Sequence, residues 1–145
     1  MKSIADIEAA IIADFTFLDD WADKYNLLMD LGKELPPFPE EFKTEQYRIQ
    51  GCQSKVWLKS HFNEDKRIVL EADSDALISK GLVALLVKVL NHQTPEEILH
   101  APLNFIKEIG LDSHLSPNRA NGLASMLKQI RLEAKVYAQQ TASHQ

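Results

Sequence analysis

Apolar residues recur at helical spacing in the first third of the chain. Over Ser3–Asp14 they return every three or four positions, which predicts an amphipathic helix. A second helix is predicted over Trp21–Leu31, with Asp20 as its N-terminal cap and Gly32 at its end. Three prolines follow between positions 36 and 39. Because proline lacks an amide hydrogen and restricts the backbone, this stretch is predicted to be a stiff connection.

The periodicity changes in the middle of the chain. Three short runs alternate or are rich in β-branched residues, as strands are: Tyr47–Ile49, Val56–Leu58 and Arg67–Leu70. Asn63–Lys66 is a polar turn between the second and third runs, and Gly51–Ser54 connects the first two. The pattern predicts a small antiparallel sheet of about three strands.

Helical patterns return after Asp73. Ala76–Leu90 is apolar around most of its circumference, which predicts the central and most buried helix. Thr94–Glu97 combines an N-cap, a proline at the first helical position and a capping-box glutamate. Ser116–Pro117 begins a last helix, whose apolar stripe contains Leu123, Met126, Leu127, Ile130, Ala134 and Tyr137. The chain is predicted to form one α+β domain over residues 1–145, a small sheet packed against several helices, with its last few residues disordered.

The charge of the chain is unevenly distributed. Residues 1–50 carry eleven acidic and five basic side chains, whereas residues 51–145 carry ten acidic and eleven basic ones. Nucleic-acid binding depends on basic side chains that replace the counterions of phosphates. With no basic stripe, the chain is not expected to bind nucleic acid.

Membrane and secretory features are not expected either. The longest apolar run, Gly81–Leu90, is interrupted by Lys88 and is too short to cross a bilayer. Asp6 and Glu8 lie where a secretory signal needs an apolar segment. We therefore expect a cytoplasmic protein without a membrane partner.

The chain has one cysteine, Cys52. A single thiol rules out an internal disulfide, a two-cysteine oxidoreductase and an iron–sulfur cluster held by this chain's cysteines alone. The five histidines show no metal-binding spacing, so no metal site is expected. Sulfur transfer through a persulfide needs only one thiolate. On spacing alone, two alternatives stay open: an inert buried cysteine, and a hydrolase in which the fold brings a histidine beside the thiol.

The neighbours of Cys52 favour a reactive thiol. Gly51 has no side chain, so the backbone can turn sharply and another chain can approach. The predicted loop presents the thiol to a partner. An ordinary cysteine is only slightly ionised at neutral pH. Lys55 is a candidate cation for activation, and we expect a partner's site to complete it.

Several segments resemble one known family. GCQSKVWL, at Gly51–Leu58, closely resembles the active-site signature of the SufE family of sulfur acceptors. Further segments match the family's order: Trp21–Tyr25, Leu31–Pro36, Ala72–Ala76 followed by Lys80–Leu82, and Leu115–Arg119 with Gly122, Leu123 and Met126. The resemblance covers about Phe15 to Ile130. It departs at Ala72, where glycine is usual, and at Asn118, where serine is common.

The resemblance implies a function. Cys52 would accept sulfur from the persulfide of a cysteine desulfurase, stimulate that enzyme and pass sulfur to an iron–sulfur scaffold. Gln53 and Ser54 resemble the SufE branch more than the CsdE branch, which implies a SufS-like desulfurase. The pyridoxal phosphate belongs to that partner, so the chain itself needs no cofactor and is a persulfide carrier rather than a stand-alone enzyme. The implied fold is similar to that of the IscU-type scaffold proteins.

Other residues receive weaker assignments. Gly51, Gln53 and Arg119 are candidates for partner binding or for support of the cysteine loop. Asp73 and Asp75 are interpreted mainly as caps of the buried helix, although the resemblance also implies a place at the partner interface. The remaining alternatives are a regulator that binds the desulfurase without accepting sulfur, and the Cys–His hydrolase. Burial of the thiol at rest would protect a persulfide and would require the loop to move when the donor docks.

Overall fold

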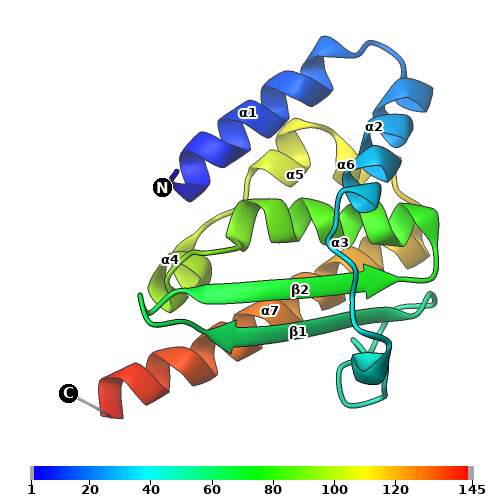
Figure 1. The fold of residues 1–145 in the computed structure, drawn as a ribbon. Helices are drawn as coiled ribbons and strands as arrows, with labels where there is room; N and C mark the ends of the chain where they lie inside the picture. Colours follow the sequence, from blue (N-terminus) through cyan, green and yellow to red (C-terminus); the bar gives the residue numbers. More distant parts are fainter. Residues whose placement is uncertain (1, 144–145) are drawn as a thin grey trace.

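The chain folds into helices around a two-stranded sheet, as the α+β prediction requires (Figure 1). The computed structural model describes residues 2–143. The predicted disorder of the last few residues concerns positions 144–145, which lie outside that range. The elements are α1 (Ile4–Phe17), α2 (Trp21–Lys33), a 3₁₀ turn η1 (Glu40–Phe42), β1 (Val56–Phe62), β2 (Ile68–Ser74), α3 (Leu77–Leu90), α4 (Pro95–His100), α5 (Phe105–Glu108), α6 (Leu111–His114) and α7 (Pro117–Ser143).

Side chains cap several helices at their N-termini. The Ser3 hydroxyl accepts the amide hydrogen of Asp6, 3.1 Å away, at the start of α1. Asp20 caps α2 as predicted, accepting from the amide of Ala22 at 3.0 Å. The predicted capping box of α4 is also present. These local contacts satisfy amide groups that have no partner within the helix, which is why the starts could be predicted from the sequence.

The predicted end of α2 is wrong, because the helix continues through Gly32 to Lys33. A Cβ built on Gly32 would lie 3.0 Å from the backbone nitrogen of Gly81 in α3. A Cβ on Gly81 would lie only 2.4 Å from the carbonyl oxygen of Leu28 in α2. The two glycines therefore allow α2 and α3 to approach closely, and neither terminates a helix.

The sheet has two strands, with isolated bridges from Arg48 to Trp57 and from Gln93 to Ile68. β1 and β2 are antiparallel, with Val56 opposite Ser74 and Phe62 opposite Ile68. The predicted strand Tyr47–Ile49 pairs only through the bridge between Arg48 and Trp57. This run is enclosed by turn residues before it and a left-handed Gly51 after it, so the pairing cannot extend. The expected three-strand sheet is corrected to two strands and isolated bridges.

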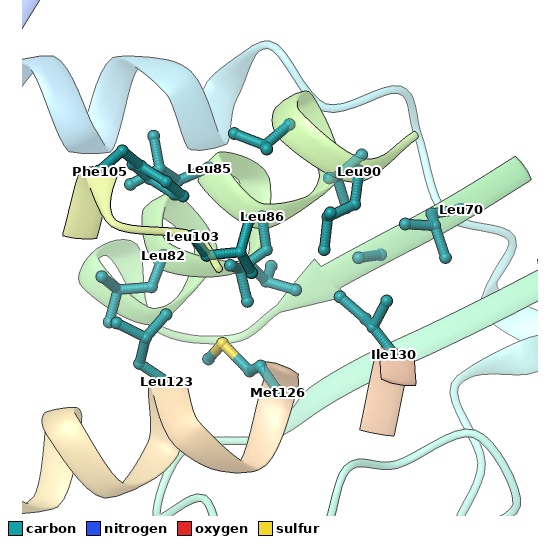
Figure 2. Close-up of a cluster of buried hydrophobic side chains, with 14 of the residues drawn as sticks. Leu70, Leu82, Leu85, Leu86, Leu90, Leu103, Phe105, Leu123, Met126 and Ile130 are labelled. Carbon is teal, nitrogen blue, oxygen red and sulfur yellow. The ribbon is translucent and has the colours of Figure 1, made fainter. Parts of the chain in front are cut away.

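The hydrophobic core surrounds α3, as predicted. Nine of its fourteen residues are buried. Figure 2 shows its leucines facing side chains of α7 and of the segment before α5; the labelled residues are Leu70, Leu82, Leu85, Leu86, Leu90, Leu103, Phe105, Leu123, Met126 and Ile130. α1 and α2 cover one side of α3, and the sheet and α7 lie on the other (Figure 1). This packing holds the first turns of α3 and α7 in place.

Within residues 2–143, no helix combines the length and hydropathy that crossing a membrane requires.

Candidate functional site

The loop before β1 carries Cys52 and turns at Gly51. Gly51 has φ +93°, a left-handed conformation that residues with a side chain seldom adopt. A Cβ at this position would also lie 2.4 Å from the hydroxyl oxygen of Ser125 in α7. Glycine is therefore needed both for the turn and for the contact between the loop and α7.

The thiol of Cys52 is half-buried against the first turns of α7. Its Sγ donates a weak hydrogen bond to the carbonyl oxygen of Gly122, 3.6 Å away. A Cβ at Gly122 would itself lie 3.6 Å from Sγ. The glycine therefore leaves space beside the sulfur that any other residue would fill.

A cavity of about 370 Å³ opens next to the thiol. It lies between the cysteine loop, the first turns of α3 and the start of α7, and its lining is mostly polar: Cys52, Gln53, Ser54, Ser79, Leu82, Ser116, Asn118, Arg119, Gly122 and Met126. The Ser79 hydroxyl donates to the Ser54 hydroxyl at 3.1 Å, which ties the loop to α3. The site thus combines one nucleophile with hydroxyl, amide and guanidinium groups.

Two opposing effects act on the thiol. Burial raises the pKa of Cys52 above its ordinary value, because the thiolate loses solvation. The positive charge of Arg48 lowers this pKa, but by less. A bridge to Trp57 holds Arg48 beside the start of β1, into which the cysteine loop leads. The cation that influences the thiol is therefore Arg48 rather than Lys55, the residue that sequence proximity suggested.

Asp75 supports the end of the loop. Its carboxylate accepts the amide hydrogen of Lys55 at 2.9 Å, and its own amide donates to the Lys55 carbonyl at 3.1 Å. The Ser74 hydroxyl donates to the same carbonyl at 2.8 Å. The predicted capping role is wrong, since the N-cap of α3 is Ala76 and has no side-chain hydrogen bond. Asp75 instead anchors the loop where it enters β1.

Asp73 does not line the cavity. It connects β2, in which it lies, to α3 and to the segment after η1. Its carboxylate lies 3.1 Å from the ammonium of Lys43, after η1, and 3.2 Å from that of Lys80 in α3. Burial raises its pKa, but the Ser74 amide and the two lysines outweigh this effect, so the pKa of Asp73 is lower than usual. Its interactions are those of a structural ion-pair cluster.

The structure brings together some of the predicted site residues. Cys52, Gln53 and Arg119 line the same cavity, and Gly51 allows the loop to turn. Asp75 contacts the end of the loop through the amide of Lys55. Sequence reasoning missed Ser79 and the contact of Gly122 with the sulfur. Gly122 lies in a resembling segment, which could have indicated it, whereas Ser79 falls between two such segments.

Other chemistries find little support near Cys52. Among the described residues that line the cavity there is no histidine. Within residues 2–143, no three side chains of the metal-binding kinds lie together.

Fold and site together define a class of protein: an α+β domain that presents one half-buried thiol beside a polar cavity. The family is shown by sequence comparison. Residues 9–134 match the model of SufE, described as an Fe-S metabolism associated domain. The chain belongs to the SufE family, which places it in iron–sulfur metabolism.

Relatives in other organisms agree with this membership. An uncharacterised SufE-like protein of Rhizobium meliloti (strain 1021) is 43% identical over 129 residues, covering 86% of this chain and 92% of that protein. SufE-like protein 1, chloroplastic/mitochondrial, of Arabidopsis thaliana is 42% identical over 124 residues, covering 86% of this chain but 33% of its own length.

The fold also recurs in a hypothetical protein from Thermus thermophilus, whose solution structure matches with a TM-score of 0.75. That match has 21% sequence identity and covers 92% of this chain and 96% of the other.

Proposed function

We propose that Cys52 accepts sulfur from the persulfide of a SufS-like cysteine desulfurase and passes it on for iron–sulfur cluster assembly. The observation that carries the proposal is the thiol's position beside a polar cavity of about 370 Å³, with Gly122 next to the sulfur. The cavity and the missing side chain of Gly122 leave room for a donor and for a second sulfur. Family membership in iron–sulfur metabolism supports the same reaction.

The transfer is a thiol–persulfide exchange. The Cys52 thiolate attacks the outer sulfur of the donor persulfide, forming a sulfur–sulfur bond to Cys52. The sulfur–sulfur bond of the donor breaks, and its electron pair stays on the donor cysteine as a thiolate. The outer sulfur keeps its proton or loses it to solvent, and no external oxidant or reductant is needed.

Docking of the donor completes the activation of the thiol. In the free protein, burial keeps Cys52 mainly protonated at neutral pH. The loop is held by the Ser79–Ser54 hydrogen bond and by the contact of Sγ with Gly122. A donor cysteine that reaches Sγ must displace part of this arrangement, and its own site then removes the proton. A titration that found a full thiolate in the free protein at neutral pH would contradict this step.

Intact mass spectrometry tests the function directly. The protein is incubated with a purified SufS-like desulfurase and cysteine, and its mass is measured before and after reductant. We expect a gain of one sulfur that maps to Cys52 and is lost on reduction. Cys52→Ser must gain none, while Glu64→Gln, a change at an exposed position in the turn between β1 and β2 and outside the cavity lining, must gain as much as the native protein. Native protein that gains no sulfur overturns the proposal.

The same variants separate the alternatives. A pure regulator of the desulfurase would stimulate cysteine turnover equally well as Cys52→Ser, whereas a sulfur acceptor loses that stimulation while it still binds. A Cys–His hydrolase would need a histidine as well, so each of the five histidines is changed to alanine and sulfur loading is measured. We expect loading to survive every histidine change.

Location and onward transfer are parts of the same proposal. A reactive single thiol needs a reducing compartment, and we propose the cytoplasm. Loaded protein, freed of desulfurase, should deliver its sulfur to a cluster scaffold supplied with iron and reductant. Fractionation of cells and cluster absorbance on the scaffold measure these two points. The name of the Arabidopsis relative gives chloroplasts and mitochondria as the location of that protein.

A further inference from the structure

Two exposed apolar features lie outside the lining of the cavity beside Cys52 and have opposite charges around them. Phe17 ends α1 and is 85% exposed, more than any other large apolar side chain of the described residues. Leu132, in α7, is 48% exposed. Monomeric proteins expose single apolar side chains routinely, so exposure alone indicates nothing. The arrangement of charges around each feature carries the inference.

The feature on α7 is an apolar groove with cations. Its cavity, of about 400 Å³, lies between α4 and α7, and the residues that matter are Leu99, Leu127, Leu132, Lys128, Arg131 and Lys135. Lys128, Leu132 and Lys135 follow each other at four and three residues, so they share one face of the helix. We call this set the α7 groove.

The two lysines of the α7 groove are available to a partner. Arg131 donates to the carbonyl oxygen of Ala101 at 2.7 Å, so its guanidinium is partly engaged. Lys128 and Lys135 form no ion pair with any residue in the described part of the chain. The carboxylate of Glu133, in the same part of α7, accepts a hydrogen bond from the hydroxyl of Ser60 in β1. The face therefore presents apolar surface with uncompensated positive charge.

The feature at the end of α1 has the complementary pattern. Asp14 lies one turn before Phe17, and Asp19 follows two residues after it. Neither carboxylate forms an ion pair within residues 2–143. Asp20 is used as the cap of α2. We call Phe17 with Asp14 and Asp19 the Phe17 knob: one large apolar side chain between two free carboxylates.

The knob and the groove cannot meet within one molecule. Figure 1 shows α1 and α7 on opposite sides of α3. Two α7 grooves facing each other would bring lysines together, which is unfavourable. We propose that the α7 groove binds the Phe17 knob of a second copy of this chain. Phe17 enters the apolar groove, and its two carboxylates lie near Lys128 and Lys135.

This contact is heterologous, because each copy contributes a different surface to it. It leaves a free knob on one molecule and a free groove on the other, so association proceeds head to tail. A single aromatic side chain and two exposed ion pairs make a small interface, and we expect a dissociation constant on the order of 100 µM or weaker. Because its charges are exposed, salt weakens the contact.

Complementation between two variants tests the proposal. Phe17→Ser removes the knob and keeps the groove, while Leu132→Ser removes the groove's central leucine and keeps the knob. Sedimentation is measured for each full-length protein from about 10 µM to 1 mM, a range that brackets the expected affinity. The native mass must rise with concentration, whereas each variant alone must stay at the 16.4 kDa of one chain. An equimolar mixture must form two-chain complexes and nothing larger.

A matched control and thermal unfolding keep the test specific. Leu77→Ser also removes an exposed leucine, 61% accessible, from another face and must associate like the native protein. Both test residues are exposed, so the variants must unfold like the native chain. A native protein that stays monomeric throughout overturns the proposal, as does a mixture that does not associate. If Leu132→Ser weakens binding to the desulfurase while the native chain stays monomeric, the groove belongs to that enzyme and the proposal is wrong.

Discussion

The middle of α3 and its first turn face very different surroundings. From Leu82 to Leu90 every residue but Lys88 is buried, between α1 and α2 on one side and the sheet and α7 on the other. At its beginning, Ser79 lines the polar cavity and is bonded to the cysteine loop. Leu82 takes part in both, as a core residue and as part of the cavity wall.

This difference separates stability from reactivity. Apolar burial in the core stabilises the fold without touching the thiol. The cysteine loop is held by a few hydrogen bonds, two glycine contacts and Asp75, which together place one sulfur atom. Substitutions in the core should therefore change unfolding and leave the thiol unaffected, and substitutions around the loop should change the thiol as well.

The largest effect on stability is expected at the core. Leu86 is fully buried, and Leu86→Ala should lower the free energy of unfolding by about 2–5 kcal/mol, because it loses buried surface and leaves a cavity. Denaturant unfolding measures the loss. Below the unfolding transition, sulfur loading of Cys52 should equal that of the native protein. Leu132→Ala, on the surface, is the control and should change stability by less than about 0.5 kcal/mol.

A smaller loss of stability with a change in the thiol is expected at Gly51. Gly51→Ala strains a left-handed backbone and meets Ser125, so we expect a cost of about 1–3 kcal/mol and faster alkylation of a displaced Cys52. Gly110→Ala is the matched control, since Gly110 has φ +84° but contacts Trp21. It should destabilise the protein without changing alkylation. Equal alkylation rates for both variants would contradict the role of Gly51.

Asp73 should contribute to stability in a pH-dependent way. Its pKa is lower in the folded state, so its contribution is complete above the ordinary pKa of about 3.9 and is lost as the pH falls through the lowered value. Asp73→Asn should cost about 1–2 kcal/mol at neutral pH and nothing in strong acid. Unfolding measured across this range tests the sign. Glu64→Gln, an exposed turn residue, should show no such dependence, and a constant loss in Asp73→Asn would exclude an ionic origin.

The smallest effect concerns the charge near the thiol. Arg48→Gln should raise the pKa of Cys52 further and slow its alkylation at neutral pH about two- to threefold, because a positive charge is lost. Glu45→Gln removes the carboxylate 3.2 Å from the Arg48 guanidinium and should shift the pKa the other way. Alkylation rates across a pH series give both midpoints. Lys55→Gln should leave the midpoint unchanged, and a larger effect there than at Arg48 would reverse the assignment.

Most of the local structure was determined by the sequence itself. The helix caps at Ser3, Asp20 and Thr94 join residues only a few positions apart, and so does the apolar pattern of α3. Such short-range interactions can be predicted from the order of residues along the chain. The single Cys52 and the segment around it were sufficient to indicate the family that the comparison then showed.

Only the tertiary structure decided how the site is built. The Gly122 carbonyl that accepts from Cys52 is seventy positions away, and Arg48, four residues before Cys52, is held by a bridge to Trp57. Asp75 was expected to cap α3. Its carboxylate instead accepts the amide hydrogen of Lys55, which lies just before β1. Gly32 was expected to end α2, but in the structure it allows α2 to pack closely against α3. Such contacts join residues that only packing brings together, so no periodicity along the chain encodes them.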